Sequence, residues 1–320
     1  MKPKVIVSWI PPDGDALSRI SAVSNPVVWG GGEQMDEGFL RREAATAVGI
    51  YSMLTDQIDA DLLESAPELR VVSNMAVGVD NIDLAACAAA GVSVGHTPDV
   101  LTETTADTAF MLVLASSRRM LEGVDMVRGG RWGTWVGDAM LGLDVSGTTI
   151  GIVGMGRIGA AIATRATGFS MDILYWSRSP KPDVEASTGA KRVSLEELLT
   201  HADHVVLAVP LSSETRHLIG PHELSQMKAS ANLVNISRGP VIDTGALVDA
   251  LESQEIRCAG LDVTDPEPIP ADHPLVSLAN CTIVPHIGSA TLRTRNAMAD
   301  LAVDNLIAGV LGEPLPNPVV

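Results

Sequence analysis

The chain of 320 residues predicts an α/β fold with two domains, each built on a parallel β-sheet flanked by helices. Three observations support this prediction. The length is about twice that of one ordinary domain. Short apolar runs alternate with longer stretches of helical period along the whole chain. The alternation breaks at Thr97-Pro98 and resumes at Thr148, so the sequence contains two strand–helix series.

The first series contains five candidate strands, each of which ends near polar or turn residues. They are predicted at 5–10, 27–29, 47–51, 69–74 and 92–95. An alanine-rich helix is expected at 84–90, and one long helix is expected from Thr102 to about Arg128. Apolar residues at helical spacing predict the long helix, namely Ala106, Ala109, Phe110, Val113 and Leu114.

The second series begins at Thr148 and ends in a long helical segment at 289–309. Its further strands are predicted at 173–176, 204–209, 232–236, 258–263 and 282–284. We interpret the two long helices as segments that carry the chain from one domain to the other and back. The prediction is therefore two Rossmann-like or flavodoxin-like domains, in which a domain at 99–287 is inserted into a domain formed by 1–98 plus 288–320.

Composition excludes several functional classes. There are 22 Lys and Arg against 39 Asp and Glu, and the resulting charge of −17 would be repelled by nucleic-acid phosphates. No apolar run approaches the roughly 18 residues that a membrane-spanning helix needs. Cys87, Cys258 and Cys281 are far apart and form no CxxC pair, which argues against disulfides and structural zinc. We therefore expect a cytoplasmic protein that binds no nucleic acid, no membrane and no metal.

The strongest local motif is G-x-G-x-x-G at Gly154, Gly156 and Gly159, between a predicted strand and an alanine-rich helix. The first glycine permits a tight turn, the second lets backbone approach a pyrophosphate, and the third lets the helix pack against the strand. N–H groups at the helix N-terminus then face the phosphates. The inserted domain is therefore predicted to bind a nicotinamide dinucleotide, and the other domain the substrate.

The end of the next strand indicates which dinucleotide binds. Proteins that select NAD usually place an acid about 20 residues beyond the glycines, where it holds the ribose 2′-hydroxyl. This chain has Ser177 there, 18 residues after Gly159, followed by Arg178, Ser179 and Lys181. Two cations and no acid favour a 2′-phosphate. NADP(H) is the preferred cofactor, with NAD(H) possible; the alternative is that these charges only face solvent.

Three consecutive strands of the second series end next to residues that suit carbonyl reduction. Arg238 follows the strand at 232–236, Glu267 follows that at 258–263, and His286 follows that at 282–284. Arg238 can clamp a substrate carboxylate and polarise a ketone, while His286 can donate a proton to the ketone oxygen. Glu267 can orient the imidazole by accepting its second N–H. Each residue alone is more often structural, but their joint placement indicates an active site.

The motifs at 154–159, 237–239, 266–268 and 285–289 resemble those of the D-isomer-specific 2-hydroxyacid dehydrogenases, over nearly the whole chain. The segments 94–102, 262–268 and 285–291 most resemble the glyoxylate/hydroxypyruvate reductase branch. This resemblance implies reduction of glyoxylate to glycolate and of hydroxypyruvate to D-glycerate, with Arg238, Glu267 and His286 as catalytic residues. It also implies cofactor contacts at Gly154, Gly156, Arg157, Ile158, Gly159, Ser177, Arg178, Ser179, Lys181, Pro210, Thr215, Ile236, Asp262 and Gly288.

Substrate binding is expected to involve the first domain as well. Val77 and Gly78 follow a predicted strand and offer backbone N–H groups, with almost no side-chain bulk at Gly78, which suits a small carboxylate. Leu54 lies in a loop that can form a second wall, although this segment is equally read as an ordinary connection. Ser289 can hydrogen-bond the hydroxyl of hydroxypyruvate, beside Arg238 and His286.

Two alternatives to this function remain open, and one expectation concerns assembly. The chain could act on another 2-oxo acid, such as pyruvate or a larger one, or it could be a non-catalytic binding protein that senses a dinucleotide. The segment 128–135, which contains Trp132 and Trp135, resembles the arm through which members of the family dimerise. A homodimer is therefore expected.

Overall fold

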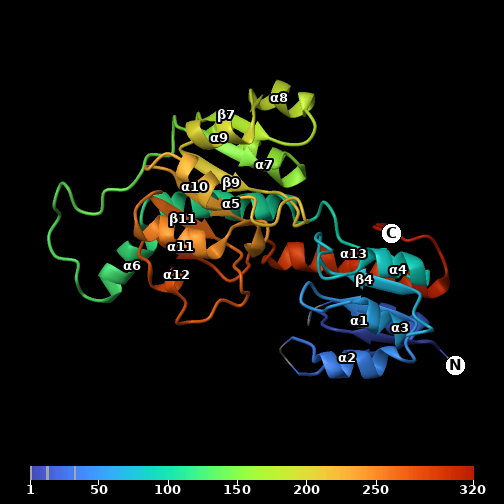
Figure 1. Cartoon of the computed structure of the whole chain (residues 1–320). Helices are drawn as coiled ribbons and strands as arrows, with labels where there is room; N and C mark the ends of the chain where they lie inside the picture. The colour runs from blue at the N-terminus through green and yellow to red at the C-terminus, as the bar shows by residue number, and fades with distance from the viewer. Residues whose placement is uncertain (1, 12–13, 32–33) are drawn as a thin grey trace. The chain divides into compact units, whose positions relative to one another are not determined.

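The computed structural model describes residues 2–11, 14–31 and 34–320, and it divides the chain into two compact units (Figure 1). Unit 1 consists of Met1–Leu101 and Thr291–Val320, and unit 2 consists of Thr102–Ala290. Both boundaries predicted from the sequence lie three residues before these. The chain thus leaves unit 1, builds all of unit 2, and returns.

Unit 1 contains a five-stranded parallel sheet in the order β2-β1-β3-β4-β5. Its strands are β1 (Lys4–Val7), β2 (Asn25–Val28), β3 (Gly49–Ser52), β4 (Val71–Asn74) and β5 (Ser93–Gly95). Every residue of β3 and β4 is buried, including the polar Ser52, Ser73 and Asn74, as expected of central strands that are covered on both faces. The strand order is that of flavodoxin-like folds.

The helices of unit 1 begin and end at residues that favour helix termini. The side chains of Asp36, Asp59 and Asp83 accept hydrogen bonds from backbone N–H groups in the first turns of three helices. Gly91 and Gly312 end two helices in the left-handed conformation that glycine adopts without strain. The helices are α1 (Ala16–Val23), α2 (Glu37–Ala44), α3 (Ala60–Glu64), α4 (Leu84–Ala90) and α13 (Leu292–Leu311), the last of which packs on β3 and β4.

Unit 2 contains a seven-stranded parallel sheet in the order β12-β11-β10-β9-β6-β7-β8. Its strands are β6 (Thr149–Val153), β7 (Asp172–Trp176), β8 (Lys191–Arg192), β9 (His204–Leu207), β10 (Asn232–Asn235), β11 (Cys258–Leu261) and β12 (Cys281–Ile283). The strand order reverses between β6 and β9, as in Rossmann folds. Ligands of such sheets bind beyond the carboxyl ends of the strands at this reversal.

Helices cover this sheet, and two apolar cores fill the space between helices and strands. Helix α5 packs on β10 and β11 and also against α7. The helices of unit 2 are α5 (Thr102–Ser117), α6 (Met120–Arg128), α7 (Arg157–Gly168), α8 (Pro182–Thr188), α9 (Leu195–His201), α10 (Pro221–Gln226), α11 (Thr244–Glu252) and α12 (Pro274–Ser277), with a 3-10 turn at Gly239–Val241. The structure therefore confirms the predicted fold class, two α/β units with parallel sheets.

The single long helix expected from Thr102 to about Arg128 is wrong, because the chain forms two helices there. Arg119 has a φ of 53°, in the left-handed region, and this residue separates α5 from α6. The carbonyl oxygen of Ser117 accepts a hydrogen bond from the N–H of Leu143 at 2.8 Å, a tertiary contact at the point where α5 ends. Local periodicity carries no signal of that contact. Within the described ranges, no helix is long and apolar enough to span a bilayer.

Candidate active site

The strands β10, β11 and β12 are neighbours in the sheet of unit 2, and each is followed by one of the three predicted catalytic residues. Arg238 follows β10, Glu267 lies in the loop after β11, and His286 follows β12. The carboxyl ends of parallel strands meet at one edge of a sheet. The fold therefore brings these three positions to the same edge of unit 2.

Glu267 and His286 form a direct hydrogen bond, with 2.6 Å between His286 Nδ1 and Glu267 Oε1. An ionised carboxylate only accepts hydrogen bonds, so Nδ1 carries a proton and Nε2 is the nitrogen that can exchange a proton with a ligand. The other carboxylate oxygen, Oε2, accepts the N–H of Thr264 at 3.2 Å. Both oxygens of Glu267 are thus engaged, which fixes the carboxylate and, through it, the imidazole ring.

The surroundings of Glu267 favour its ionised form. Burial raises the pKa of this carboxyl, but the hydrogen bond and charge of His286, the N–H of Thr264 and the charge of Arg238 together outweigh burial. The net result is a pKa of Glu267 below its usual value. Glu267 therefore remains a carboxylate near neutral pH, and the imidazole keeps its proton on Nδ1.

The backbone at His286 is held in an uncommon conformation, with a φ of 51°. Its N–H lies 2.9 Å from the carbonyl oxygen of Asp262 and 3.0 Å from that of Val284. The Asp262 carboxylate accepts the N–H groups of Ile287 at 2.7 Å and Gly288 at 2.9 Å. Burial raises the pKa of Asp262, and these two N–H groups oppose that effect. Asp262 thus fixes the turn that carries His286. Its expected contact with the cofactor stays a prediction.

The turn that carries Arg238 is fixed by Asn235, the last residue of β10. Asn235 donates a hydrogen bond to the carbonyl oxygen of Arg238 at 2.8 Å and accepts one from the Ser237 hydroxyl at 2.8 Å. Gly239 then packs directly against the loop after β11, where a Cβ would lie 1.9 Å from the carbonyl oxygen of Thr264. Only glycine fits there, so the Arg238 turn and the Glu267 loop are in backbone contact.

The glycine motif forms the turn between β6 and α7. Gly154 has a φ of 105°, and a Cβ at Gly159 would lie 2.1 Å from the carbonyl oxygen of Gly154. At Gly156, the residue before α7, a Cβ would meet nothing within 4 Å, and no side chain caps the helix. Open space at an uncapped helix N-terminus fits the pyrophosphate of a dinucleotide. Gly154 thus forms the tight turn, Gly156 leaves open space at the helix N-terminus, and Gly159 allows the helix to pack closely against the strand.

Arg192 holds the loop that follows β7. Its guanidinium donates to the carbonyl oxygen of Ser177 from Nε at 3.2 Å and from Nη2 at 3.0 Å, and to that of Arg178 at 3.1 Å. The Ser177 hydroxyl donates to the carbonyl oxygen of Ser179 at 2.6 Å. No sequence pattern marks Arg192, because β8 is a two-residue edge strand that is too short to show a period.

Tyr175 holds the other end of the same loop. Its hydroxyl accepts the N–H of Lys181 at 2.9 Å and donates to the carboxylate of Glu185. Arg192 and Tyr175 therefore fix the segment from Ser177 to Lys181 at both ends. The side chains of this segment are the ones predicted to bind a 2′-phosphate, and this role stays a prediction.

The remaining predicted cofactor residues surround the same edge of unit 2. The Thr215 hydroxyl donates to the carbonyl oxygen of Pro210 at 2.6 Å and accepts the N–H of Ser212 at 2.8 Å, which closes the turn after β9. Ile236 is buried directly after β10. Arg157 and Ile158 lie in the first turn of α7, and Gly288 follows His286 and Ile287 after β12. Ser289, which is predicted to bind the substrate, is the next residue.

The predicted substrate residues of the first domain lie after two neighbouring strands of unit 1. Leu54 follows β3, and Val77 and Gly78 follow β4; all three are partly exposed. Asn81 joins these two loops, because its amide donates to the carbonyl oxygens of Met53 at 3.2 Å and Asp56 at 2.8 Å.

Comparisons with known proteins agree with this fold. Residues 110–288 match the family model of the NAD binding domain of D-isomer specific 2-hydroxyacid dehydrogenases. A glyoxylate reductase of Korarchaeum cryptofilum is 47% identical over 321 residues, covering 100% of this chain and 96% of that protein. A glyoxylate/hydroxypyruvate reductase B of Yersinia enterocolitica is 50% identical over 264 residues, covering 82% of this chain and 81% of that protein.

A solved structure gives the same result for the whole chain. The NADPH-dependent glyoxylate/hydroxypyruvate reductase of Sinorhizobium meliloti, in complex with NADP and malonate, superposes with a TM-score of 0.88. It is 33% identical in sequence, and the match covers 100% of this chain and 97% of that one. The glycine motif, the strand order and these matches lead to one conclusion. The chain belongs to the D-isomer specific 2-hydroxyacid dehydrogenase family.

Proposed function

We propose that this protein is an NADPH-preferring reductase of glyoxylate and hydroxypyruvate, which forms glycolate and D-glycerate. The observation that carries the proposal is the 2.6 Å hydrogen bond between His286 and Glu267, on the sheet edge that also bears Arg238. An oriented imidazole beside a guanidinium suits the reduction of a ketone or aldehyde next to a carboxylate. The names of the relatives in Korarchaeum, Yersinia and Sinorhizobium support the choice of substrate.

In this mechanism Arg238 binds and orients the substrate. Its guanidinium pairs with the carboxylate of the 2-oxo acid and polarises the neighbouring carbonyl oxygen. NADPH, when bound, supplies the hydride that the carbonyl carbon receives. Asn235 and Gly239 hold the turn that carries Arg238 against the loop that carries Glu267. The group that binds the substrate is therefore proposed to lie close to the pair that transfers the proton.

His286 supplies the proton in the same step. Its Nε2–H donates to the carbonyl oxygen as negative charge develops there, and the product hydroxyl keeps that proton. Glu267 holds Nδ1–H throughout, so the ring cannot turn and the charge of the imidazolium is compensated until the proton leaves. Solvent then returns a proton to Nε2 before the next turnover.

The preference for NADPH rests on the loop after β7. Ser177 occupies the position where an acid would repel a 2′-phosphate, and Arg178 and Lys181 supply positive charge. Arg192 adds a third cation, whose hydrogen bonds are made to carbonyl oxygens. The structure of the Sinorhizobium relative with NADP supports this assignment. We propose that NADH is accepted more weakly.

The test is initial-rate kinetics of the purified protein with a panel of 2-oxo acids and both nicotinamides. Glyoxylate and hydroxypyruvate should be reduced with NADPH, and His286→Ala should lower kcat/KM by roughly 100- to 10,000-fold. Normal turnover by that variant would contradict the mechanism. If pyruvate or a larger 2-oxo acid is reduced faster than glyoxylate and hydroxypyruvate, the protein is instead a dehydrogenase acting on that 2-oxo acid. Inertness toward every 2-oxo acid, together with NADPH binding, would favour a dinucleotide-sensing protein.

We extend the proposal to the substrate residues of unit 1 and to Ser289. Backbone N–H groups of Val77 and Gly78 are proposed to bind the substrate carboxylate, with Leu54 as an apolar wall. Ser289 is proposed to bind the hydroxyl of hydroxypyruvate. Ser289→Ala should therefore raise the KM for hydroxypyruvate and leave that for glyoxylate unchanged, because glyoxylate has no hydroxyl.

We also propose that the protein is a homodimer, because unit 2 bears two exposed apolar surfaces. The first is an arm at 129–141 that extends from the unit (Figure 1), in which Trp132, Trp135 and Leu141 are 69%, 85% and 60% exposed. The second is a cavity of about 670 Å³ along α5. The cavity is lined by Asp107, Phe110, Met111, Leu114, Ala115, Arg118, Met120, Arg165 and Phe169.

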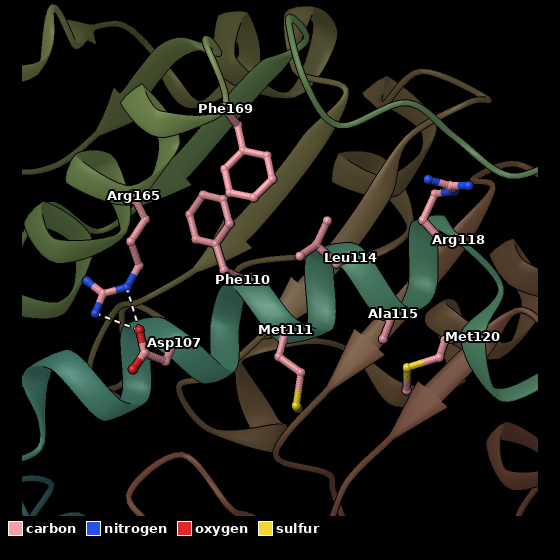
Figure 2. A pocket seen from close by; sticks show the side chains of 9 residues that line it. All are labelled: Asp107, Phe110, Met111, Leu114, Ala115, Arg118, Met120, Arg165 and Phe169. Carbon is pink, nitrogen blue, oxygen red and sulfur yellow. Dashed lines mark hydrogen bonds and ion pairs between the residues drawn. The ribbon is translucent and has the colours of Figure 1, made fainter. Parts of the chain in front are cut away.

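Figure 2 shows how this α5 cavity is built. Phe110 and Phe169 stack at 5.2 Å between ring centroids, and the ion pair of Asp107 with Arg165 closes one end. Exposed aromatic side chains are typical anchors of protein interfaces, and an apolar cavity is their usual receptor. The arm of one copy is therefore proposed to cover the α5 cavity of another.

We propose that the protein is located in the cytoplasm. All three cysteines are free, buried thiols, which suits that reducing compartment.

A further inference from the structure

In the loop after β4, at 76–79, every carbonyl oxygen accepts a hydrogen bond, whereas no N–H group donates one to a residue that the structure describes. Its four carbonyl oxygens accept hydrogen bonds from the N–H of Thr97, the ring of His96, the amide of Asn74 and the N–H of Ile82, all between 2.9 and 3.0 Å. Among the described residues, none accepts a hydrogen bond from an N–H of Ala76, Val77, Gly78 or Val79. The loop thus presents a row of donors and no acceptor, as anion-binding backbone does.

The peptide geometry links each bound carbonyl to one N–H. In a trans peptide, the carbonyl of one residue and the N–H of the next lie in one plane and point in opposite directions. The bond from His96 Nδ1 to the carbonyl oxygen of Val77, at 3.0 Å, therefore orients the N–H of Gly78. The bond from Asn74 Nδ2 to the carbonyl oxygen of Gly78, at 2.9 Å, orients the N–H of Val79 in the same way.

Asn74 is fixed by the buried interior of unit 1. Its side chain is wholly buried, its Oδ1 accepts the hydroxyl of Ser52 at 3.1 Å, and its Nδ2 also lies 3.3 Å from Oδ1 of Asn81. An amide held by three partners has one orientation, because a flipped amide would place its oxygen against the Gly78 carbonyl. Asn74 therefore contributes a donor of fixed direction.

His96 is fixed by the C-terminal part of unit 1. Its N–H donates to the carbonyl oxygen of Asn317 at 3.1 Å, and its carbonyl oxygen accepts the amide of Asn305 at 2.9 Å. Oδ1 of Asn305 accepts the N–H of Asn317 at 2.9 Å. Since a carbonyl only accepts, the ring must carry its proton on Nδ1. Asn305 and Asn317 thus fix the backbone that carries the Nδ1–H donor of His96.

We propose that His96 and Asn74 are positioning residues for the carboxylate of the substrate, and that the N–H of Val79 is a third donor beside those of Val77 and Gly78. The inference rests on the proposed function, in which this loop binds that carboxylate. His96 and Asn74 do not touch the substrate; they turn two peptide planes so that N–H groups, and not carbonyl oxygens, meet the anion. Losing either donor frees its plane to rotate.

The test compares His96→Leu, which removes the donor, with His96→Asn, whose amide nitrogen lies as many bonds from Cα as Nδ1 does. His96→Leu should raise the KM for glyoxylate about five- to ten-fold, the effect of one lost hydrogen bond, with kcat and the KM for NADPH nearly unchanged. His96→Asn should restore the KM for glyoxylate. His222→Leu, at an exposed histidine of α10, is the matched control and should change nothing.

Binding of malonate to the NADPH-loaded protein, measured by calorimetry, separates this inference from the proposed function. Malonate should bind less tightly to His96→Leu than to wild type and His96→Asn, even if no 2-oxo acid is turned over. No binding to wild type, or equal binding to all three, overturns the inference. If His96→Leu does not fold, Asn74→Ser, which is too short to reach the Gly78 carbonyl, must show the same selective loss or the inference fails.

Discussion

A Cβ at Gly239 would lie 1.9 Å from the carbonyl oxygen of Thr264, so the turn that carries Arg238 touches the loop that carries Glu267 through backbone alone. The N–H of Thr264 in turn binds the Glu267 carboxylate at 3.2 Å. One close contact therefore couples Arg238, which is proposed to bind the substrate, to the Glu267–His286 pair, which is proposed to move the proton. Disrupting the contact between Gly239 and Thr264 should therefore displace Arg238 and Glu267 without removing any of their functional groups.

We predict that Gly239→Ala lowers kcat/KM strongly and destabilises the fold by about 1–3 kcal/mol, because backbone must move to admit the methyl group. Gly168→Ala is the matched control, since a Cβ at that helical position meets nothing within 4 Å. Thermal unfolding and initial rates measure both effects. Unchanged kcat/KM in Gly239→Ala would show that the contact does not position Arg238 or Glu267.

The hydrogen bond between Glu267 and His286 should make a pH-dependent contribution to stability. Because the folded pKa of Glu267 is lowered, the contribution is complete above the ordinary pKa of 4.5 and is lost as the pH falls through the lower folded pKa. We predict that wild type exceeds Glu267→Gln in stability at pH 7 and that the difference shrinks as the pH falls below 4.5. Urea unfolding at several pH values measures it; a difference that grows toward low pH would contradict the assignment.

Much of the fold follows from local pattern. Strands of a parallel sheet are buried on both faces, so β3, β4, β9 and β10 each contain consecutive apolar residues that can be recognised from the sequence alone. Helix termini are less well marked. The predicted helix across Arg119 failed because a single left-handed residue interrupts a periodicity that continues on both sides.

The candidate site divides in the same way. The placement of Arg238, Glu267 and His286 at one sheet edge could be predicted, because each follows a strand and the topology of parallel sheets determines where strand ends lie. Their catalytic roles stay predictions. Arg192 and His96 could not be predicted, because they donate to carbonyl oxygens of segments that lie elsewhere in the chain. Asn74 could not either, because its bond to the carbonyl oxygen of Gly78 depends on the path that the intervening loop takes. No spacing or composition distinguishes them from surface charges or core polar residues.

For the cofactor, we predict that Arg178→Gln combined with Lys181→Gln raises the KM for NADPH about 10- to 100-fold, as expected for lost hydrogen bonds to a charged group. The KM for NADH should stay nearly constant, because NADH lacks the 2′-phosphate. Lys191→Gln, at an exposed cation of β8, is the control for a general loss of positive charge. Equal effects on the two nicotinamides would refute a 2′-phosphate site.

Arg192 offers a second test of the same loop. Arg192→Lys keeps the charge but cannot make the three hydrogen bonds to the carbonyl oxygens of Ser177 and Arg178. We predict a higher KM for NADPH in this variant and an unchanged kcat. If charge alone mattered, Arg192→Lys would behave as wild type and Arg192→Gln would not.

His204 should link stability to pH in unit 2. Burial lowers the pKa of this histidine, whose Nε2 donates to the carbonyl oxygen of Asp144 at 3.1 Å. A lowered folded pKa means that its contribution is complete above the ordinary value of 6.5 and is lost as the pH falls through the folded pKa. We predict that the urea midpoint of wild type falls between pH 7 and 5 and that this fall is smaller in His204→Gln. An equal fall in both proteins would assign it to other groups.

The proposed dimer predicts that changes on either apolar surface have the same effect. Trp135→Ser removes an arm residue that is 85% exposed, and Leu114→Arg places a charge in the α5 cavity. Both should convert the dimer to monomer in sedimentation velocity, because an arm without its aromatic anchor and a cavity with a buried charge each remove one half of the contact. Val276→Ser, at an exposed apolar residue of α12, should leave the dimer intact. If only one of the two surfaces mattered, arm and cavity would not be partners, and another surface would have to receive the arm.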